Sequence, residues 1–325
     1  MGMTMNLPTN LPLTRAPRAP AATFLGWPSV TDLDSLAADV ALLGIPYNAP
    51  YSMEEVANNQ AQAPDAVRAR SDQIQWTDGN YDFDHGGPLL DGKAVRLADC
   101  GNVPGNQYDA AGNVKRAEMA VRAILQAGAL PIILGGDHGA SVPALRAYEG
   151  RGPITLVHID AHLDWRDHVN GVRDGYSSPI RRASELPWIE TAWQIGLRGV
   201  GSAREIEVAA ARKWGSHLIT AWDLHEMGIA ALLEKLPTGK NIYLTIDADG
   251  LDPTVMPGVI APVPGGVTFV QARAIIRHAV MRNRLVGMDI VEIAPERDVG
   301  GLTCITAGRL ITNMLGCAVR AGYFG

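Results

Sequence analysis

Short apolar runs alternate with amphipathic segments along most of this 325-residue chain. Nearly continuous apolar runs predict strands near 40–43, 95–99, 130–134, 154–160, 193–197, 217–219, 242–247 and 285–292. Apolar residues at helical spacing predict helices near 64–71, 114–127, 140–149, 178–185, 202–213, 225–235, 268–282 and 302–320. Strands that are apolar on both faces and alternate with helices are typical of a buried parallel sheet. We therefore predict an α/β fold with one parallel sheet of about eight strands, covered by helices on both faces.

The beginning of the chain differs from the rest in composition. Residues 1–24 are rich in Pro, Thr, Ala and Asn and show no periodicity. We predict an N-terminal arm over residues 1–30. A single α/β domain is predicted over residues 31–325, because no repeat and no linker divides that stretch.

Charge and cysteine content narrow the class of protein. The net charge is −6 and no block rich in Lys or Arg occurs, so we expect no nucleic-acid partner. The apolar runs are shorter than the roughly 20 residues of a membrane span, and no signal peptide is recognisable, so we expect no membrane partner. The cysteines are Cys100, Cys304 and Cys317. This sparse, odd set predicts buried small apolar residues and a cytoplasmic location.

Asp and His residues follow three of the predicted strands. One follows the run at 132–134, three follow the run at 154–157, and two follow the run at 242–244. They are His138, Asp160, His162, Asp164, Asp247 and Asp249. In a strand, side chains at i, i+2 and i+4 share a face, so we expect the triplet at 160–164 to point to one side. Parallel strands end at a common edge, where the three groups would meet.

This set of side chains favours a pair of metal ions. Four converging carboxylates would cost several kcal/mol each to bury without cations. Two divalent ions with two bridging carboxylates remove that cost, and two His with four Asp suit Mn²⁺, and also Ni²⁺, Co²⁺ or Fe²⁺. Adjacent ions lower the pKa of a bound water and polarise the attacked group. The spacing therefore predicts hydrolysis, at either a carbon or a phosphorus centre.

Three motifs together resemble a known family. Gly-Gly-Asp-His at 135–138, Asp-Ala-His-Leu-Asp at 160–164 and Thr-Ile-Asp-Ala-Asp-Gly-Leu-Asp-Pro at 245–253 resemble, in this order, the signatures of the ureohydrolase superfamily of arginases and agmatinases. The similarity runs from about residue 43 to 315, and its style is agmatinase-like. The resemblance implies an arginase-like fold, a small guanidino-type substrate, and cleavage of a C–N bond that releases urea and an amine. It also implies a homo-oligomer, a trimer or a hexamer.

The resemblance assigns a role to each motif residue. One metal would be held by His138, Asp160, Asp164 and Asp247, and the other by His162, Asp160, Asp247 and Asp249. Mn²⁺ is the expected ion and Ni²⁺ the alternative. A metal-bridging hydroxide would attack the amidino carbon, and Asp164 would give a proton to the departing amine. Glu292 matches the acidic residue that binds the substrate guanidinium, and a Glu that ends an apolar strand is a suitable charge-assisted acceptor. Asp137 is expected to orient His138 or the following helix, and His158 to be a buried structural histidine.

Two loops depart from the family pattern. Tyr176 stands where the family has a His that contacts substrate or shuttles protons, and a phenol with a pKa near 10 cannot buffer at neutral pH. The loop 256–261 is more apolar than its family counterpart. We therefore expect Tyr176 to contact substrate. A substrate with a neutral or methylated distal end fits, such as a substituted guanidine or a biguanide of the metformin type (giving guanylurea and dimethylamine). A guanidino acid fits equally.

Two other functions remain open. The chain could be a supporting subunit of a mixed ureohydrolase assembly, in a hetero-oligomer with a related subunit. A degenerate subunit would have lost metal ligands, and all six are present here, so an enzyme is favoured. A deacetylase-type hydrolase on a related fold would use a sparser Asp/His set around one metal.

Overall fold

The computed structural model describes residues 17–47, 51, 59–77, 79–106 and 109–324. Its centre is an eight-stranded parallel sheet with the strand order β4-β1-β5-β10-β9-β6-β7-β8. The strands are β1 (Val40–Ile45), β4 (Leu97–Asn102), β5 (Leu130–Gly135), β6 (Ile154–Ile159), β7 (Ile189–Leu197), β8 (His217–Thr220), β9 (Asn241–Asp247) and β10 (Arg284–Val291). The predicted parallel α/β architecture is confirmed.

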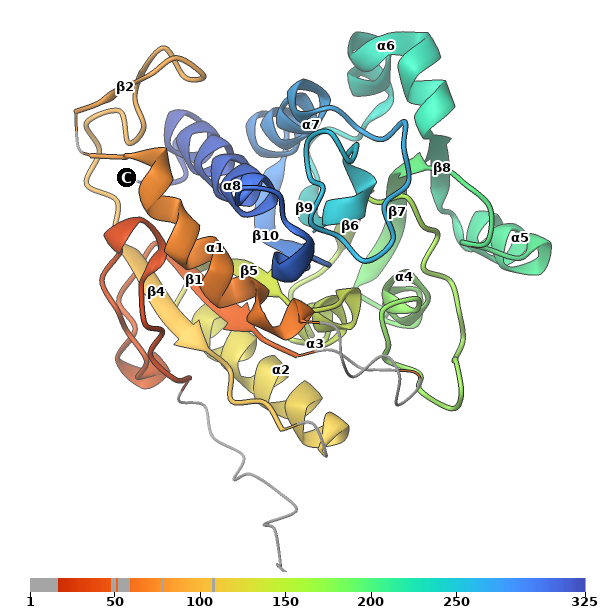
Figure 1. Cartoon of the computed structure of the whole chain (residues 1–325), viewed down its shortest axis with the longest axis horizontal. Coiled ribbons are helices and arrows are strands. Elements are labelled where there is room, and N and C mark those ends of the chain that lie inside the picture. The colour runs from red at the N-terminus through yellow and green to blue at the C-terminus, as the bar shows by residue number, and fades with distance from the viewer. Residues whose placement is uncertain (1–16, 48–50, 52–58, 78, 107–108, 325) are drawn as a thin grey trace, which may run out of the picture.

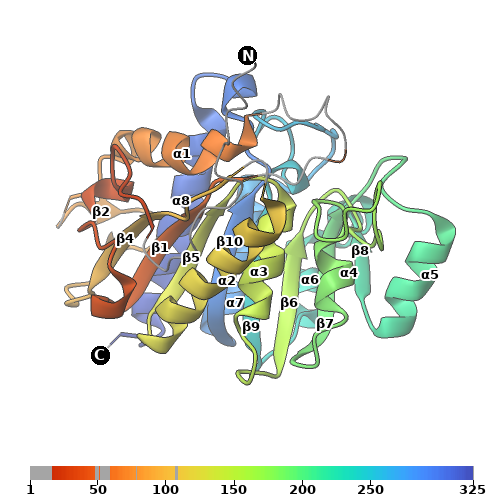
Figure 2. The same cartoon turned by 90° about the horizontal axis from the view of Figure 1, so that it is seen from below.

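Helices cover both faces of the sheet (Figures 1 and 2). They are α1 (Ala63–Ser71), α2 (Ala110–Gln126), α3 (Ser141–Arg146), α4 (Pro179–Ala183), α5 (Glu205–Trp214), α6 (Ala221–Lys235), α7 (Phe269–Met281) and α8 (Leu302–Arg320). Alternate residues of each strand face opposite layers. In β1, Val40 and Leu42 join the core beneath α1, α6, α7 and α8, whereas Ala41 and Leu43 join the core beneath α2 to α5. This two-sided burial explains the continuous apolar runs in the sequence.

Helix α8 packs as a core helix. Within the described part of the chain it is the one helix whose length and hydropathy would suit a bilayer span, and 83% of its apolar window is buried inside the fold. A small antiparallel hairpin of β2 (Tyr81–Asp82) and β3 (Gly87–Pro88), which the sequence did not predict, lies beside it. Asp84 in the hairpin accepts hydrogen bonds from Arg309 at 2.6 Å and Asn313 at 3.1 Å.

Part of the predicted N-terminal arm packs against the sheet. Residues 1–16 lie outside the described residues. Phe24 is buried in the core, and its backbone N–H donates to Asp99 Oδ2 at 2.8 Å. Arg68 binds both oxygens of the same carboxylate, at 2.8 and 2.9 Å. Arg18 and Ser29 form backbone bridges with Asn102 and Asp99 of the edge strand β4, so residues 17–30 cover an edge that would otherwise be open.

Element boundaries differ from prediction by a few residues, for local reasons. Helix α2 begins at Ala110 rather than near 114, because the Asp109 carboxylate accepts a hydrogen bond from Gly112 N at 2.9 Å and caps the helix. Strand β7 begins at Ile189, ahead of the predicted 193. The three cysteines are free and buried, as predicted.

Candidate metal centre

The sequence motifs meet at one edge of the sheet. Strands β5, β10, β9 and β6 are consecutive neighbours, and each is followed directly by one group of Asp, Glu or His residues. Because the strands are parallel, their carboxyl ends lie side by side (Figure 2). Sheet order thus brings together segments that are more than 100 residues apart in the chain, such as His138 and Asp247.

The local geometry differs from the one expected for residues 160–164. Strand β6 ends at Ile159, so Asp160, His162 and Asp164 do not share a strand face, and that part of the prediction is wrong. Instead, the Asp160 carboxylate accepts a hydrogen bond from His162 N at 2.6 Å, and Asp164 adopts a φ of 52°. A short Asp side chain readily caps the backbone two residues on, and this competes with continuation of the strand.

The same turn recurs in the other two motifs. Asp247 accepts from Asp249 N at 2.8 Å, and Asp137 accepts from Gly139 N at 2.9 Å. In Asp160 and Asp247, one carboxylate oxygen caps the turn while the other, Oδ2, faces His138. Asp137 caps the turn that carries His138, in agreement with its expected orienting role.

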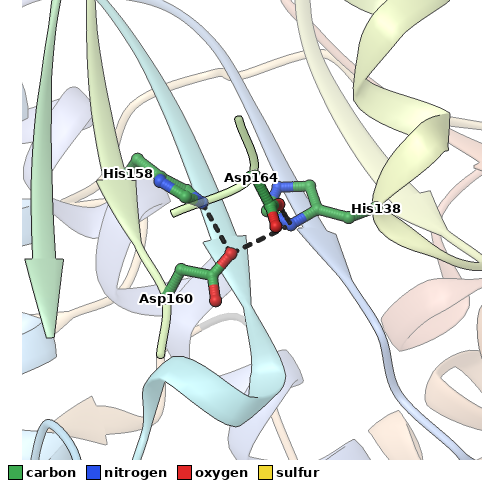
Figure 3. A group of neighbouring side chains, drawn as sticks. All are labelled: His138, His158, Asp160 and Asp164. Atoms are coloured by element: carbon green, nitrogen blue, oxygen red, sulfur yellow. Dashed lines mark hydrogen bonds and ion pairs between the residues drawn. The ribbon is translucent and has the colours of Figure 1, made fainter. Parts of the chain in front are cut away.

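The first half of the centre surrounds His138 (Figure 3). Its Nδ1 lies 3.2 Å from Asp160 Oδ2, 3.0 Å from Asp164 Oδ2 and 3.2 Å from Asp247 Oδ2. All four residues are buried. One ring nitrogen carries at most one hydrogen, so it cannot satisfy three carboxylate oxygens at once.

The second half surrounds His162. Its Nδ1 lies 3.3 Å from Asp160 Oδ1 and 3.2 Å from Asp249 Oδ2. Asp160 therefore faces both histidines, with a different oxygen toward each. Asp247 faces His138 through Oδ2, while its Oδ1 accepts a hydrogen bond from the backbone N–H of Asp249, the residue that faces His162. The His162 side chain is 28% exposed, so this half is the more open to solvent.

The close packing of carboxylates and imidazoles shifts the pKa values of the residues in the site. Burial, Asp249 and Asp160 raise the pKa of Asp247 well above its ordinary value, and burial and Asp160 also raise the pKa of Asp164. Burial lowers the pKa of His138, but its three carboxylate neighbours outweigh this and raise it well above normal. Asp160 is the exception, because His158, His138 and His162 overcome burial and hold its pKa well below normal.

These residues fit a pair of divalent cations. Within the described part of the chain, the buried Asp164 Oδ2 has no hydrogen-bond donor of its own. Its near neighbour His138 Nδ1, at 3.0 Å, is shared with two other carboxylates, and a buried carboxylate oxygen left without a donor or a cation is costly. Asp164 and Glu292 have φ values of 52° and 64°, a region that non-glycine residues rarely adopt outside functional sites. The ligand set, oxygen-rich with two imidazoles, suits Mn²⁺ or a similar ion.

His158 is buried, as expected, but it also contacts a candidate ligand. Its Nε2 lies 2.7 Å from Asp160 Oδ2 (Figure 3). Its Nδ1 lies 3.1 Å from the amide nitrogen of Gln194. The same amide donates to Leu163 O at 2.9 Å. An amide nitrogen only donates, so His158 Nδ1 must accept and Nε2 must carry the hydrogen. His158 therefore acts as a donor that orients Asp160.

Glu292 directly follows β10 and lies beside His138, and it has a partner that the sequence did not reveal. Its Oε1 accepts from His138 N at 2.7 Å, and its Oε2 accepts from the side-chain amide of Gln60. Burial and Asp137 raise the pKa of Glu292 well above normal. Gln60 comes from a polar stretch without periodicity, so no spacing signal marked it.

Tyr176 is paired with a second ring. Its centroid lies 4.4 Å from that of Tyr51, and Tyr51 Oη accepts a hydrogen bond from Ser177 N at 2.8 Å. Burial raises the pKa of Tyr51, and the charges of Asp164 and Asp137 act in the same direction. A bidentate ion pair between Asp174 and Arg146, at 2.6 and 2.9 Å, anchors the loop.

The apolar loop 256–261 runs beside Glu292. Val259 pairs with Ile293 across an isolated bridge, and Gly258 O accepts from Ala294 N at 2.7 Å. Met256 and Val259 are buried. The wall next to the expected guanidinium acceptor is therefore largely apolar.

The fold and the clustered ligands define an α/β protein with a candidate binuclear centre at the carboxyl edge of its sheet. The model of the arginase family matches residues 38–316, and the chain belongs to this family. The predicted ureohydrolase resemblance is thereby confirmed.

Relatives with known names match nearly the whole chain. A guanidinobutyrase from Pseudomonas aeruginosa is 33% identical, covering 90% of this chain and 91% of the relative. A guanidinopropionase from the same organism is 32% identical, covering 96% of each. Among solved structures, proclavaminate amidino hydrolase from Streptomyces clavuligerus superposes with a TM-score of 0.81 at 28% identity, covering 95% of this chain and 99% of that one. These relatives are guanidino or amidino hydrolases, which agrees with the predicted reaction class.

Proposed function

We propose that this protein is a binuclear-metal hydrolase of a guanidino or amidino compound, releasing urea and an amine. The observation that carries the proposal is the shared position of Asp160, whose two oxygens face His138 and His162 respectively. A single carboxylate between two histidine-centred ligand groups suits two adjacent ions. Bound divalent ions supply a water that is acidic enough to be a nucleophile at neutral pH.

Side chains around the centre are proposed to bind the substrate and to transfer a proton. Glu292, held by His138 N, accepts N–H groups of the planar guanidinium and orients its carbon toward the centre. Hydrolysis adds the water oxygen to that carbon and a proton to the departing nitrogen. Asp164 has a buried oxygen whose near neighbour, His138 Nδ1, is shared with two other carboxylates, and it is our candidate to carry that proton.

The distal part of the substrate would meet a neutral surface. The Tyr51–Tyr176 ring pair and the apolar loop 256–261 offer apolar contact and phenol hydroxyls. This observation favours a second, narrower candidate: a substrate with a neutral or methylated distal group, including a dimethylbiguanide that would yield guanylurea and dimethylamine. Guanidino acids remain to be tested beside it, because the relatives include a guanidinobutyrase and a guanidinopropionase.

Two further predictions remain for measurement. Mn²⁺ is the first proposed ion, because carboxylate oxygens outnumber imidazoles in the ligand set, and Ni²⁺ is the alternative. Assembly into a trimer or hexamer, or into a mixed oligomer with a related subunit, can be measured by light scattering of the purified protein.

The test is release of urea or guanylurea by protein loaded with Mn²⁺ or Ni²⁺. The panel comprises agmatine, arginine, 4-guanidinobutyrate, 3-guanidinopropionate, guanidine and metformin. Asp160→Ala should abolish turnover because both halves lose a ligand, and Glu226→Ala, on the exposed side of α6, serves as the control. A protein that holds two ions yet hydrolyses none of the panel would refute the proposal in favour of a supporting subunit.

A further inference from the structure

A buried series of hydrogen bonds lies on the far side of the His138 ring from the candidate metal ligands Asp160, Asp164 and Asp247. His138 Nε2 lies 2.9 Å from Thr245 Oγ1, and Thr245 Oγ1 lies 2.6 Å from Asp289 Oδ1. The other oxygen of Asp289 accepts from Tyr243 Oη at 2.7 Å. Thr245 and Asp289 are register partners on β9 and β10, so the sheet itself places them together. All four residues have zero exposed surface.

The chemistry of the groups sets the direction of this chain. An ionised carboxylate only accepts, so the Tyr243 and Thr245 hydroxyls both donate to Asp289. A hydroxyl has a single hydrogen, so Thr245 Oγ1 is left to accept from His138 Nε2–H. Nδ1, beside Asp160, Asp164 and Asp247, is then the nitrogen that offers its lone pair to a metal ion when the ion displaces a proton.

We propose that Thr245 and Asp289 are positioning residues that hold the ring orientation and tautomer of His138, and thereby set the metal affinity of the His138 half of the centre. The inference rests on the proposed function, because it assumes that His138 binds metal. Groups that hydrogen-bond the far nitrogen of a metal-binding histidine commonly change metal affinity by about 10–100-fold.

The two halves of the centre differ in the hydrogen bonding of the far nitrogen, Nε2, of their histidine. Among the described residues, none hydrogen-bonds Nε2 of His162, whose side chain is 28% exposed. The support behind His138 therefore has no counterpart behind His162. Loss of the Thr245 hydroxyl should affect one ion of the pair and spare the other.

The experiment compares variants with matched hydrogen-bond losses. Thr245→Val removes the hydroxyl at nearly constant volume and breaks the chain to His138. Thr245→Ser keeps the hydroxyl. Tyr243→Phe is the matched control, because it removes a hydrogen bond to the same Asp289 carboxylate but leaves the path to His138 intact. Equilibrium dialysis against Mn²⁺ with elemental analysis gives the affinity and number of bound ions, and thermal melting of the metal-free proteins reports stability.

We expect Thr245→Val to bind one of its two ions about 10–100-fold more weakly. Ser at position 245 should restore most of the affinity, and Tyr243→Phe should bind both ions like the wild type even if it melts earlier. Asp289→Asn, of equal size, provides an independent arm if Thr245→Val does not fold, and it should weaken the same single ion.

Several results would overturn the inference. Unchanged affinity in Thr245→Val would do so, and so would an equal loss in Tyr243→Phe, which would mean that only general packing was disturbed. Equal weakening of both ions would also contradict a role specific to His138. If the wild-type protein itself bound fewer than two ions, the proposed function would fail first, so the two failures are distinguishable.

Discussion

Removal of the metals should make the stability of this protein depend strongly on pH. In the folded metal-free protein, burial opposes protonation of His162, but Asp160 and Asp249 raise its pKa from 6.5 to about 12. His138 likewise has a pKa well above normal, because its carboxylate neighbours outweigh burial. In the unfolded chain both rings titrate near their ordinary value. The stabilisation from these two protons is therefore complete below pH 6.5 and is lost as the pH rises toward the folded-state pKa.

The size of the effect follows from proton linkage. For each extra proton that the folded state holds, the free energy of unfolding falls by about 1.4 kcal/mol per unit rise in pH. Because the unfolded rings are themselves half protonated at pH 6.5, each ring should lose roughly 2 to 3 kcal/mol between pH 6.5 and 8.5, and the two together roughly 5 kcal/mol. Asp247 has a raised pKa and acts in the same direction. Asp160 has a lowered pKa, so its contribution is lost only as the pH falls below about 4, outside this window.

Urea denaturation of chelator-treated protein at pH 6.5, 7.5 and 8.5, with and without Mn²⁺, measures this dependence. Metal ions compete with protons for the same atoms, so the stabilisation by Mn²⁺ should grow with pH. His162→Asn should reduce the slope of the metal-free protein by about 1.4 kcal/mol per pH unit. His168→Asn, an exposed imidazole in the following loop, is the control and should keep the wild-type slope. A metal-free protein whose stability is flat or rises from pH 6.5 to 8.5 would refute the charge arrangement described above.

Three further predictions concern single residues. Glu292→Gln should lower kcat/KM by one to two decades, corresponding to roughly 1.5–3 kcal/mol for a charge-assisted contact, while elemental analysis still finds two ions. Retention of wild-type kinetics would remove Glu292 from the substrate site. Tyr176→His should shift preference toward agmatine-like substrates across the panel, with metal content unchanged; an equal fall for every substrate would make its role structural. Gly250→Ala should destabilise the protein by about 1–3 kcal/mol in urea, because a Cβ there would lie 2.6 Å from Asp160 N, and unchanged stability would contradict that tight approach.

The candidate ligands could be predicted because they follow continuous apolar runs. Such runs indicate buried parallel strands, and the edge where those strands end is shared by segments far apart in sequence. The reason given for convergence at 160–164 was nevertheless wrong. The strand stops at Ile159, and the capping of His162 N by Asp160, rather than strand alternation, turns the side chains inward.

Other residues of the site could not be predicted from any pattern in the sequence. Gln60 and Glu292 are separated by 232 positions, and Tyr51 and Gln60 flank a polar stretch without periodicity. Their contacts depend on where the tertiary fold places residues 51 and 60 relative to the sheet edge. Local spacing carries no information about such a contact.

By itself, the sequence determined the layered α/β fold and the residues that gather at its carboxyl edge, because both follow from the period and length of apolar runs. Only the tertiary structure decided how those residues are held. The partners of His138 illustrate this: Thr245 reaches Asp289 because β9 lies beside β10 in one particular register. Register and strand order arise from packing of the whole sheet, so a hydrogen-bonded chain across strands cannot be read from any one segment.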